Sequence, residues 1–267
     1  MSYKLSKGSL GDRMKSFYEN ITRFFLLRRT YTIIRIDGKS FHGYTRGLQM
    51  PFDDGLMDDM DATASYLCKN IMGAKFAFVQ SDEISILITD FDEHMTQAWF
   101  GNNLQKMCSI SASMATSKFN KLRILRFVME KYNNGISTIT DTWLDNLEKM
   151  KDAEFDSRVF QLPTKTEVEN YFIWRQQDTT TNSISSVAQS LYSYTDLNNK
   201  SCDAMQEMIF QKGINWNDYD ARHKRGRMII KEIYLKGDTN RTRWTSAAPP
   251  IFTQDREYLD LLIPNNE

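Results

Sequence analysis

The stretch Tyr31–Leu48, YTIIRIDGKSFHGYTRGL, joins a β-branched run to an aspartate, a glycine and a loop rich in basic and aromatic residues. The run predicts a short strand over Tyr31–Ile36, with Asp37-Gly38 at its end. A second piece, Phe76–Ile88 (FAFVQSDEISILI), has the same character, because Ser81-Asp82-Glu83 separates two apolar segments. Strand propensity does not explain an aspartate at the end of an apolar strand. These carboxylates are therefore the first candidates for a functional site.

Asp37 and Asp82 offer the hard oxygen ligands that Mg²⁺ takes in proteins, commonly one or two carboxylates together with substrate phosphates. At Gly38 the backbone carbonyl can turn outward and add a further oxygen. Two metal ions about 4 Å apart would then support an in-line phosphoryl displacement. The alternative is that Asp37-Gly38 is an ordinary turn and Asp82-Glu83 the tip of a hairpin, since turns commonly use these residues. The spacing leaves both interpretations open.

The residues after Gly38 have the composition of a triphosphate-binding loop. Lys39 supplies a cation and Ser40 a hydroxyl, and the backbone N–H groups add donors. Arg46, in the predicted loop over residues 43–54, adds a further candidate for a phosphate contact. The alternative is a solvated loop in which Phe41 anchors the core. Lys106 falls within a predicted helix, where a surface lysine is the simpler interpretation.

Length and composition set broad limits. A chain of 267 residues can bury a sizeable core, as one large domain or a core with an appended lobe. The 34 basic and 34 acidic residues give a net charge of zero, which argues against a polybasic nucleic-acid coat but allows local basic patches. Cys68, Cys108 and Cys202 are not in CxxC spacing, which excludes a cysteine-based zinc site and suits a reducing compartment.

The targeting signals of membrane and secreted proteins are not found in the sequence. The first twenty residues lack the apolar segment of a secretory signal. No apolar run approaches the roughly 20 residues that span a bilayer. We therefore expect a soluble, cytoplasmic protein that does not insert into a membrane.

Hydrophobic spacing predicts the order of the helices and strands. In the first half we expect helices over Ser9–Arg28, Gly55–Met72 and Met95–Phe119, and strands over Lys75–Val79 and Ile84–Thr89. Residues 122–150 show a weaker pattern. In the second half we expect a strand over Phe155–Leu162, a helix from Pro163 to Arg175, a further helix after Asn182, another over Ser201–Gln211, a strand over Met228–Leu235 and a loop from Gly237.

The resulting order, β-α-β-β-α, predicts an α+β fold: a polymerase-palm or ferredoxin-like antiparallel sheet with packed helices and a helical C-terminal elaboration. We divide the chain into a palm-like catalytic core over residues 1–121, a helical insertion over 122–154 and the remainder of the core over 155–267.

Four segments, IRIDGKSFHGYTRGL, QSDEISILI, FDSRVFQLP and YFIWRQQD, occur in the same order as in the tRNA-His guanylyltransferase superfamily, which this sequence resembles. The Thg1-like members of that superfamily add nucleotides in the 3′-to-5′ direction. The resemblance covers roughly Phe17 to Leu235 and is loose between Leu122 and Met150. It implies a palm-like catalytic domain similar to that of polymerases.

The resemblance also implies roles for individual residues. Asp37 and Asp82 match the two carboxylates that hold two Mg²⁺ ions, with the Gly38 carbonyl beside them and Glu83 as their acidic partner. The remaining matches are to nucleotide and RNA contacts: Lys39, Ser40, Phe41, His42, Arg46 and Ser81 for the activating ATP or GTP, Arg35 and Lys106 for the triphosphate of the incoming nucleotide, Asn182 as a further nucleotide contact, and Lys224 and Arg225 for tRNA.

Two departures from the family pattern bear on which branch of the family the sequence resembles. Members that add guanylate to tRNA-His carry His-Ile-Asn-Asn after W-R-Q-x-D, whereas this chain has Thr180-Thr181-Asn182-Ser183. That pattern resembles the Thg1-like branch and its 5′-end repair polymerases. Many relatives also have Lys or Arg before the proline of Met50-Pro51, so one phosphate contact is missing here or Arg46 supplies it.

The implied reaction is templated repair of the 5′ end of tRNA, by activation with ATP and then attack of the 3′-hydroxyl of an incoming nucleoside triphosphate. The alternatives are guanylyltransfer to tRNA-His, a palm-type nucleotide cyclase, and a catalytically silent RNA-binding protein. The W-R-Q segment argues against the cyclase, and intact Asp37, Asp82 and Lys39 argue against the silent protein. The resemblance further implies a homo-oligomer, either a tetramer or a dimer.

Overall fold

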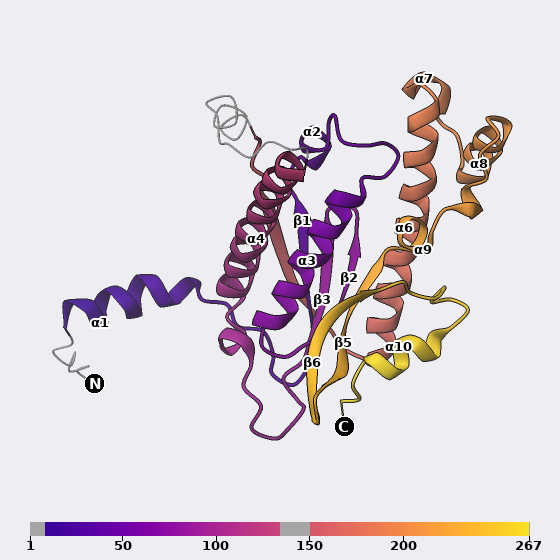
Figure 1. The fold of residues 1–267 in the computed structure, drawn as a ribbon. Coiled ribbons are helices and arrows are strands. Elements are labelled where there is room, and N and C mark those ends of the chain that lie inside the picture. The colour runs from indigo at the N-terminus through magenta and orange to yellow at the C-terminus, as the bar shows by residue number, and fades with distance from the viewer. Residues whose placement is uncertain (1–8, 134–149, 267) are drawn as a thin grey trace.

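The structure is a computed structural model that describes residues 9–133 and 150–266 (Figure 1). Its centre is one six-stranded sheet with the order β4-β1-β3-β2-β5-β6, in which every neighbouring pair is antiparallel. The strands are β1 Tyr31–Gly38, β2 Ala74–Gln80, β3 Glu83–Ile88, β4 Phe155–Leu162, β5 Arg227–Lys236 and β6 Thr239–Ala247.

Helices cover the two faces of this sheet. α3 (Asp54–Asn70) and α4 (Leu104–Asn133) lie on one face, and α6 (Lys165–Leu191) lies on the other. The shorter helices are α1 Leu10–Met14, η1 Lys15–Glu19, η2 Asn20–Thr22, α2 Phe41–Tyr44, η3 Trp99–Asn102, α7 Tyr194–Leu197, α8 Cys202–Gln211, η4 Trp216–Asp218, α9 Ala221–Arg225 and α10 Arg256–Leu262. The succession β1-α3-β2-β3-α4-β4 is the ferredoxin-like arrangement, which confirms the predicted α+β class.

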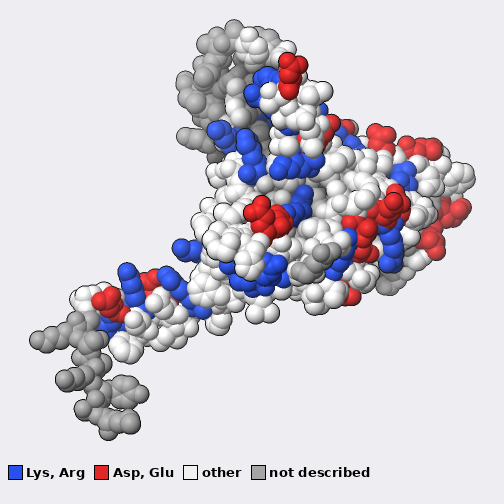
Figure 2. Space-filling view, turned by 90° about the horizontal axis from the view of Figure 1, so that it is seen from below, with Lys and Arg blue, Asp and Glu red and all other residues white. Residues whose placement is uncertain are grey.

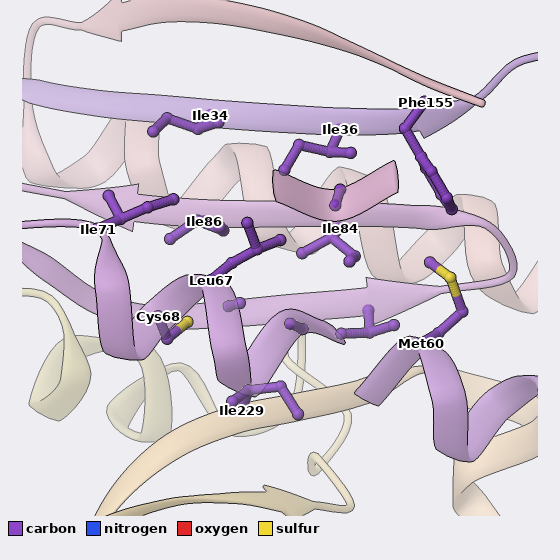
Figure 3. Packing of buried hydrophobic residues seen from close by; sticks show 14 of the residues in the cluster. Ile34, Ile36, Met60, Leu67, Cys68, Ile71, Ile84, Ile86, Phe155 and Ile229 are labelled. Atoms are coloured by element: carbon purple, nitrogen blue, oxygen red, sulfur yellow. The ribbon is translucent and has the colours of Figure 1, made fainter. Parts of the chain in front are cut away.

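Alternation along the strands divides the core into two layers. Ile34 and Ile36 of β1 pack toward α3 and α4 with Ile84 and Ile86 of β3, and Figure 3 shows this cluster. The neighbouring residue Ile33 faces the α6 side instead. Because successive side chains of a strand point to opposite faces, a strand that is apolar at every position is buried on both sides. Burial on both faces holds β1 and β3 rigidly in place, and the candidate carboxylates lie at the ends of these strands.

Four predicted helix boundaries are wrong. The helix expected from Met95 begins at Leu104, after η3, and continues through position 121 to Asn133. The predicted insertion therefore starts inside α4, and its residues 134–149 lie outside the described residues. The helix expected to end at Arg175 and the one expected after Asn182 form the single helix α6.

The two ends of the chain also differ from expectation. The predicted loop after Gly237 contains strand β6 and helix α10, and Phe252 between them is fully buried. The predicted helix over Ser9–Arg28 ends at Thr22, and its apolar residues up to Phe25 are exposed, whereas Leu26 packs against the core. Within residues 9–133 and 150–266, no helix is long and apolar enough to cross a membrane.

Candidate functional site

The two aspartates predicted as metal ligands lie at the same end of the sheet. β1 and β3 are antiparallel neighbours with Ile36 opposite Ile84, so the end of β1 meets the start of β3. Gln80 pairs with Glu83, and the intervening Ser81-Asp82 forms a two-residue turn. Ser81 adopts a left-handed conformation with φ 43°, as two-residue hairpins favour. Asp37 and Asp82 thus come together through strand pairing and a tight turn.

Gly38 brings the backbone of β1 against the Asp82 carboxylate. A Cβ atom at this position would lie 2.7 Å from Asp82 Oδ2 and 2.3 Å from the Phe41 ring atom Cδ2. No side chain fits at those distances, so the approach requires glycine. The main chain of Gly38 therefore lies directly against the Asp82 carboxylate, and its predicted role as a metal ligand stays a prediction.

The electrostatics of Asp82 suit a bound cation. Burial is the main cause that raises the pKa of Asp82 to about 6, and the charges of Asp37 and Glu83 act in the same direction. In the described part of the chain no lysine, arginine or histidine is ion-paired with Asp82. That part also holds no cluster of three or more His, Cys, Asp or Glu side chains able to bind a metal. Two carboxylates and one backbone carbonyl fit a hard ion that completes its shell with water and substrate phosphates.

Glu83 is held by two arginines. Its Oε1 accepts from Arg175 Nε at 2.9 Å and from Ser85 Oγ at 3.2 Å. Its Oε2 accepts from Arg175 Nη2 at 2.9 Å and lies 2.6 Å from Arg35 Nη2. Because both oxygens are occupied in this way, Glu83 anchors Arg35, whose Nη2 lies 3.9 Å from Asp37 Oδ2. Its predicted role as an acidic partner of the metal carboxylates stays a prediction.

Two arginines that sequence analysis did not select lie at the site. Arg175 of α6 is buried, and its guanidinium lies 4.3 Å from the Trp174 ring centroid. Arg158 of β4 pairs with Arg35 across the sheet and places Nη2 3.7 Å from Asp37 Oδ2. Arg175 had a sequence signal, because it is a cation on a helix face that is otherwise apolar. Arg158 lies in the mixed polar and apolar strand FDSRVFQL, which gives no such signal. The segments that contain them were recognised, but not these two side chains.

A cavity of about 600 Å³ opens on one side of the Ser81-Asp82 turn. Its walls are the loop over residues 45–53, the second half of α6 and α9. Several predicted nucleotide contacts line it: Phe41, His42, Arg46, Ser81 and Asn182, together with Asp82. Phe41 also packs into the core against Phe119 and Phe155, so it serves as the expected anchor as well. We call this space the loop-side cavity.

A second cavity, of about 360 Å³, lies beside the same turn. Arg35, Asp37, Glu83 and Arg175 line it, and it shares Ser81, Asp82 and Asn182 with the loop-side cavity. The Nε atom of Arg35 is buried there without a hydrogen-bond partner among the described residues. A buried donor without an acceptor favours a ligand oxygen at this point. We call this space the arginine-side cavity.

The remaining predicted residues are not brought to these cavities. Lys39 forms an ion pair with Glu154 at 2.5 Å and lines a separate hollow beside α4, and Ser40 is exposed in a left-handed turn before α2. Lys106 is in the first turn of α4, 6.0 Å from the Phe100 ring centroid, at the end of the helix that lies far from the carboxylates. Lys224 is 7% exposed and donates to the Asn217 carbonyl, so only its neighbour Arg225 remains accessible to RNA.

Comparisons with known proteins identify the family and support the fold. A protein-family model described as Thg1, tRNAHis guanylyltransferase, matches residues 11–163. The solved structure of a bacterial tRNA(HIS) guanylyltransferase (Thg1)-like protein in complex with ATP has a TM-score of 0.79 at 44% identity, over 96% of this chain and 99% of that one. The complex of such a protein with GTP gives 0.76 and 45%, over the same shares. A probable tRNA(His) guanylyltransferase of Drosophila melanogaster is 24% identical over 86% of this chain and 76% of its own length.

Proposed function

The chain belongs to the tRNA(His) guanylyltransferase family, and we propose that it is a metal-dependent nucleotidyltransferase that extends the 5′ end of tRNA in the 3′-to-5′ direction by copying a template strand. The observation that carries this proposal is the pair of cavities that meet at the Ser81-Asp82 turn. A reverse polymerase must bring first an activating nucleotide and then an incoming nucleotide to the same 5′-phosphate of the RNA. Two spaces that both reach the Asp82 carboxylate meet this need.

Asp37, Asp82 and the Gly38 carbonyl would hold Mg²⁺ at the arginine-side cavity, which both aspartates line. When bound, the metal supplies positive charge that stabilises the phosphoryl transition state. The donor set fits because Asp82 is a largely buried carboxylate without a cationic partner among the described residues. Arg35 and Arg158 lie on the Asp37 side of the pair and are placed to bind phosphate oxygens at the edge of the arginine-side cavity.

The reaction has two steps. An oxygen of the RNA 5′-monophosphate attacks the α-phosphorus of ATP, a new P–O–P link forms, and pyrophosphate leaves. The 3′-hydroxyl of the incoming nucleoside triphosphate then attacks the 5′-phosphorus of the RNA, loses its proton, and displaces AMP. We assign the activating ATP or GTP to the loop-side cavity, beside His42 and Arg46, and the incoming triphosphate to the arginine-side cavity, beside Arg35.

Our assignment of the chain to one branch of the family rests on a residue near the middle of α6. Thr180 stands where members that add guanylate to tRNA-His have histidine. Its hydroxyl donates to the carbonyls of Gln176 and Lys224, at 3.1 and 3.3 Å, so it ties α6 to α9. A threonine so placed offers no imidazole to RNA. The higher identity to Thg1-like structures than to the Drosophila relative, 44% against 24%, supports the same branch.

A substrate panel tests this function. A 5′-monophosphorylated tRNA that lacks its first nucleotide is incubated with ATP, Mg²⁺ and each nucleoside triphosphate, and full-length tRNA-His is incubated with GTP in parallel. We expect addition of the nucleotide that pairs with the template base, and an addition to full-length tRNA-His that is at least tenfold slower. Strong guanylate addition to intact tRNA-His would instead place the chain in the tRNA-His branch. Release of cyclic nucleotide without RNA would overturn the proposal.

The family also favours assembly of the chain into a homo-oligomer, which we include in the proposal as a dimer or tetramer. The net charge of zero fits an enzyme that grips RNA phosphates through local basic patches.

A further inference from the structure

Trp174 of α6 is the most exposed tryptophan in residues 9–133 and 150–266. It is 50% exposed, whereas its neighbours Ile173 and Arg175 are buried, and the other tryptophans in those ranges are buried or partly buried. Tryptophan is highly buried on average, because its large ring system contributes strongly to stability when it leaves water. A ring that stays half exposed beside a cavity is therefore a candidate contact for a flat ligand.

The ring of Trp174 is held in one orientation by its neighbours. The guanidinium carbon of Arg175 lies over the ring, 4.3 Å from its centroid. Tyr171, which is buried, meets the ring edge-on, with the two centroids 5.9 Å apart and an interplanar angle of 67°. Arg175 is itself hydrogen-bonded to Glu83 and Asp178. Because one face of the indole is covered and half of its surface is exposed, the other face is presented to solvent.

The position of Trp174 around α6 associates it with the arginine-side cavity. An α-helix turns by about 100° per residue, so Trp174 lies within about 40° of Asp178 and Ser185 around the helix axis. Both of these residues line the arginine-side cavity and not the loop-side cavity. Ser183, which lines only the loop-side cavity, lies on the opposite side of the helix, about 180° from Trp174. Trp174 therefore borders the arginine-side cavity.

Arg158 of β4 borders the same cavity from the other side. The rings of Phe160 and Tyr171 are in contact, with centroids 5.6 Å apart, which places β4 beside α6. β4 begins at the carboxylate end of the sheet, and α6 returns toward that end. From this contact, Arg158 is two residues nearer the carboxylates, about 7 Å along the strand and on the same face. Trp174 is three residues nearer, about 4.5 Å along the helix. The two side chains therefore lie at a similar level.

Templated addition at a 5′ end leaves one face of the incoming base without a neighbour. The incoming base pairs with the template base, and one of its faces stacks on the first base of the RNA. Its outer face has no base of the same strand to stack on. We propose that Trp174 stacks on this outer face and thereby positions the incoming nucleotide. The inference rests on the proposed templated reaction and makes Trp174 a positioning residue of its second step.

An aromatic ring suits this role better than a hydrogen-bonding side chain. Every base has a π face, so a stacking contact accepts any base that the template selects. Stacking of one base on an aromatic side chain contributes a factor of roughly 5 to 150 in binding. Arg158 and Arg35, which lie beside Asp37, are placed to bind the phosphates of the same nucleotide. Base and phosphates are then held by separate groups.

The charge distribution increases the weight of such a contact. Figure 2 shows the molecule from below, and on that face Lys and Arg are interspersed with Asp and Glu rather than gathered into one basic surface. The whole chain has 34 basic and 34 acidic residues. Phosphate neutralisation therefore depends on local cations such as Arg35 and Arg158. Stacking adds affinity that does not depend on charge.

The first test separates the two steps of the reaction. A 5′-truncated tRNA is supplied already adenylylated at its 5′ end, and addition of the matched nucleotide is measured. We expect Trp174→Ala to raise the KM of the incoming nucleotide about tenfold or more, with kcat within about twofold of the native value, and Trp174→Phe to keep the KM within about threefold. Adenylylation of a 5′-monophosphorylated tRNA by ATP should proceed at the native rate in both variants.

The control is Phe210→Ala, which removes a comparably exposed aromatic residue of α8 and leaves both steps unchanged. An equal loss in the two steps of Trp174→Ala would indicate a structural role and overturn the proposal. So would a Trp174→Phe variant as impaired as Trp174→Ala, because a phenyl ring preserves a stacking surface.

A fluorescence experiment detects the stacking without chemistry. The 5′-triphosphate of 2-aminopurine riboside, whose emission falls when the base stacks, is bound with a 5′-truncated tRNA that has uridine as template base and a 5′-hydroxyl, which cannot be activated. At protein concentrations that saturate the anisotropy, we expect emission at least twofold lower with the native protein than with Trp174→Ala. Equal emission from the two complexes would overturn the stacking. A native protein that adds nucleotides without this difference retains the proposed function alone, and one that adds no templated nucleotide overturns both.

Discussion

Arg175→Met is expected to lower the free energy of unfolding by about 3 kcal/mol. The side chains of Glu83 and Arg175 are only 6% and 4% exposed, and two hydrogen bonds of 2.9 Å join them. Breaking a buried ion pair by removing one partner typically costs about 3–5 kcal/mol, because the remaining charge stays buried. Arg35 still lies 2.6 Å from Glu83 in the variant, which places the cost at the lower end of that range.

Urea denaturation followed by far-ultraviolet circular dichroism measures this cost. Protein concentration is held fixed, because the stability of an oligomer depends on it. The matched control is Arg222→Met, which removes an ion pair of 2.7 Å to Asp58 whose two side chains are 32% and 53% exposed. Exposed pairs contribute about 0–1 kcal/mol. We therefore expect the control to lie within about 1 kcal/mol of the native protein.

The double variant Glu83→Gln/Arg175→Met separates the pair from the rest of the site. If the cost arises from an unpaired buried carboxylate, neutralising Glu83 recovers part of it, and the two single changes are non-additive by about 1–3 kcal/mol. Arg175→Met that unfolds within 1 kcal/mol of the native protein would refute the assignment of Glu83 as an anchor held by arginines. So would a double variant whose loss equals the sum of the single losses.

Three further outcomes are expected. Gly38→Ala places a Cβ within 2.7 Å of Asp82 Oδ2, so we expect the rate of nucleotide addition to fall at least tenfold. The control is Gly43→Ala, whose Cβ meets no atom within 4 Å and which leaves the rate unchanged. Asp37→Ala and Asp82→Ala each lower nucleotide addition to 5′-truncated tRNA by at least a hundredfold, and undiminished addition would contradict the metal assignment. In metal-free protein, burial raises the pKa of Asp82 from 3.8 to about 6, so the folded state favours the protonated carboxyl. The contribution of this protonation to the free energy of unfolding is complete below pH 4 and is lost as the pH rises through 6. Urea denaturation should therefore find Asp82→Asn more stable than the native protein by up to about 3 kcal/mol at pH 7.5, and equally stable at pH 3.5.

The part of the fold that carries the site was predictable from sequence. Apolar runs that are buried on both faces, as in β1 and β3, are recognised without tertiary information. The short polar segment Gln80-Ser81-Asp82-Glu83 between such runs predicts a hairpin. Once Ile36 pairs with Ile84, Asp37 and Asp82 must lie at the same end of the two neighbouring strands. The pair of carboxylates therefore follows from local patterns.

The errors arose where tertiary contacts override local preference. Residues 179–186 are rich in Thr and Ser, which are weak helix formers. Their hydroxyls nevertheless bond to carbonyls four residues earlier, as Thr179 and Ser185 do, and α6 continues. Beyond them Val187 and Ala188 pack in a cluster with Ile209 of α8. Burial against α8 thus stabilises this part of α6, although its residues have a low helix propensity.

Strand β6 escaped prediction because it is an edge strand. Its sequence, TNRTRWTSA, is polar, and its side chains are mostly exposed. It pairs with β5 from Thr239 to Ala247, and its other side is the free edge of the sheet. Polar and charged residues at an edge prevent pairing with other chains. The same composition removes the apolar alternation that predicts a strand.

In the proposed reaction, the position of the Ser81-Asp82 turn lets the Asp82 carboxylate take part in both steps. Ser81 and Asp82 line both the loop-side cavity and the arginine-side cavity. Ser81 holds a left-handed backbone, which costs a non-glycine residue about 1–2 kcal/mol. Strain of this kind persists where the surrounding structure enforces it, commonly at functional sites. Here strand pairing between Gln80 and Glu83 on either side enforces it. Under the proposed reaction, the RNA 5′ end would stay beside Asp82 while the activating nucleotide occupies the loop-side cavity and the incoming nucleotide the arginine-side cavity.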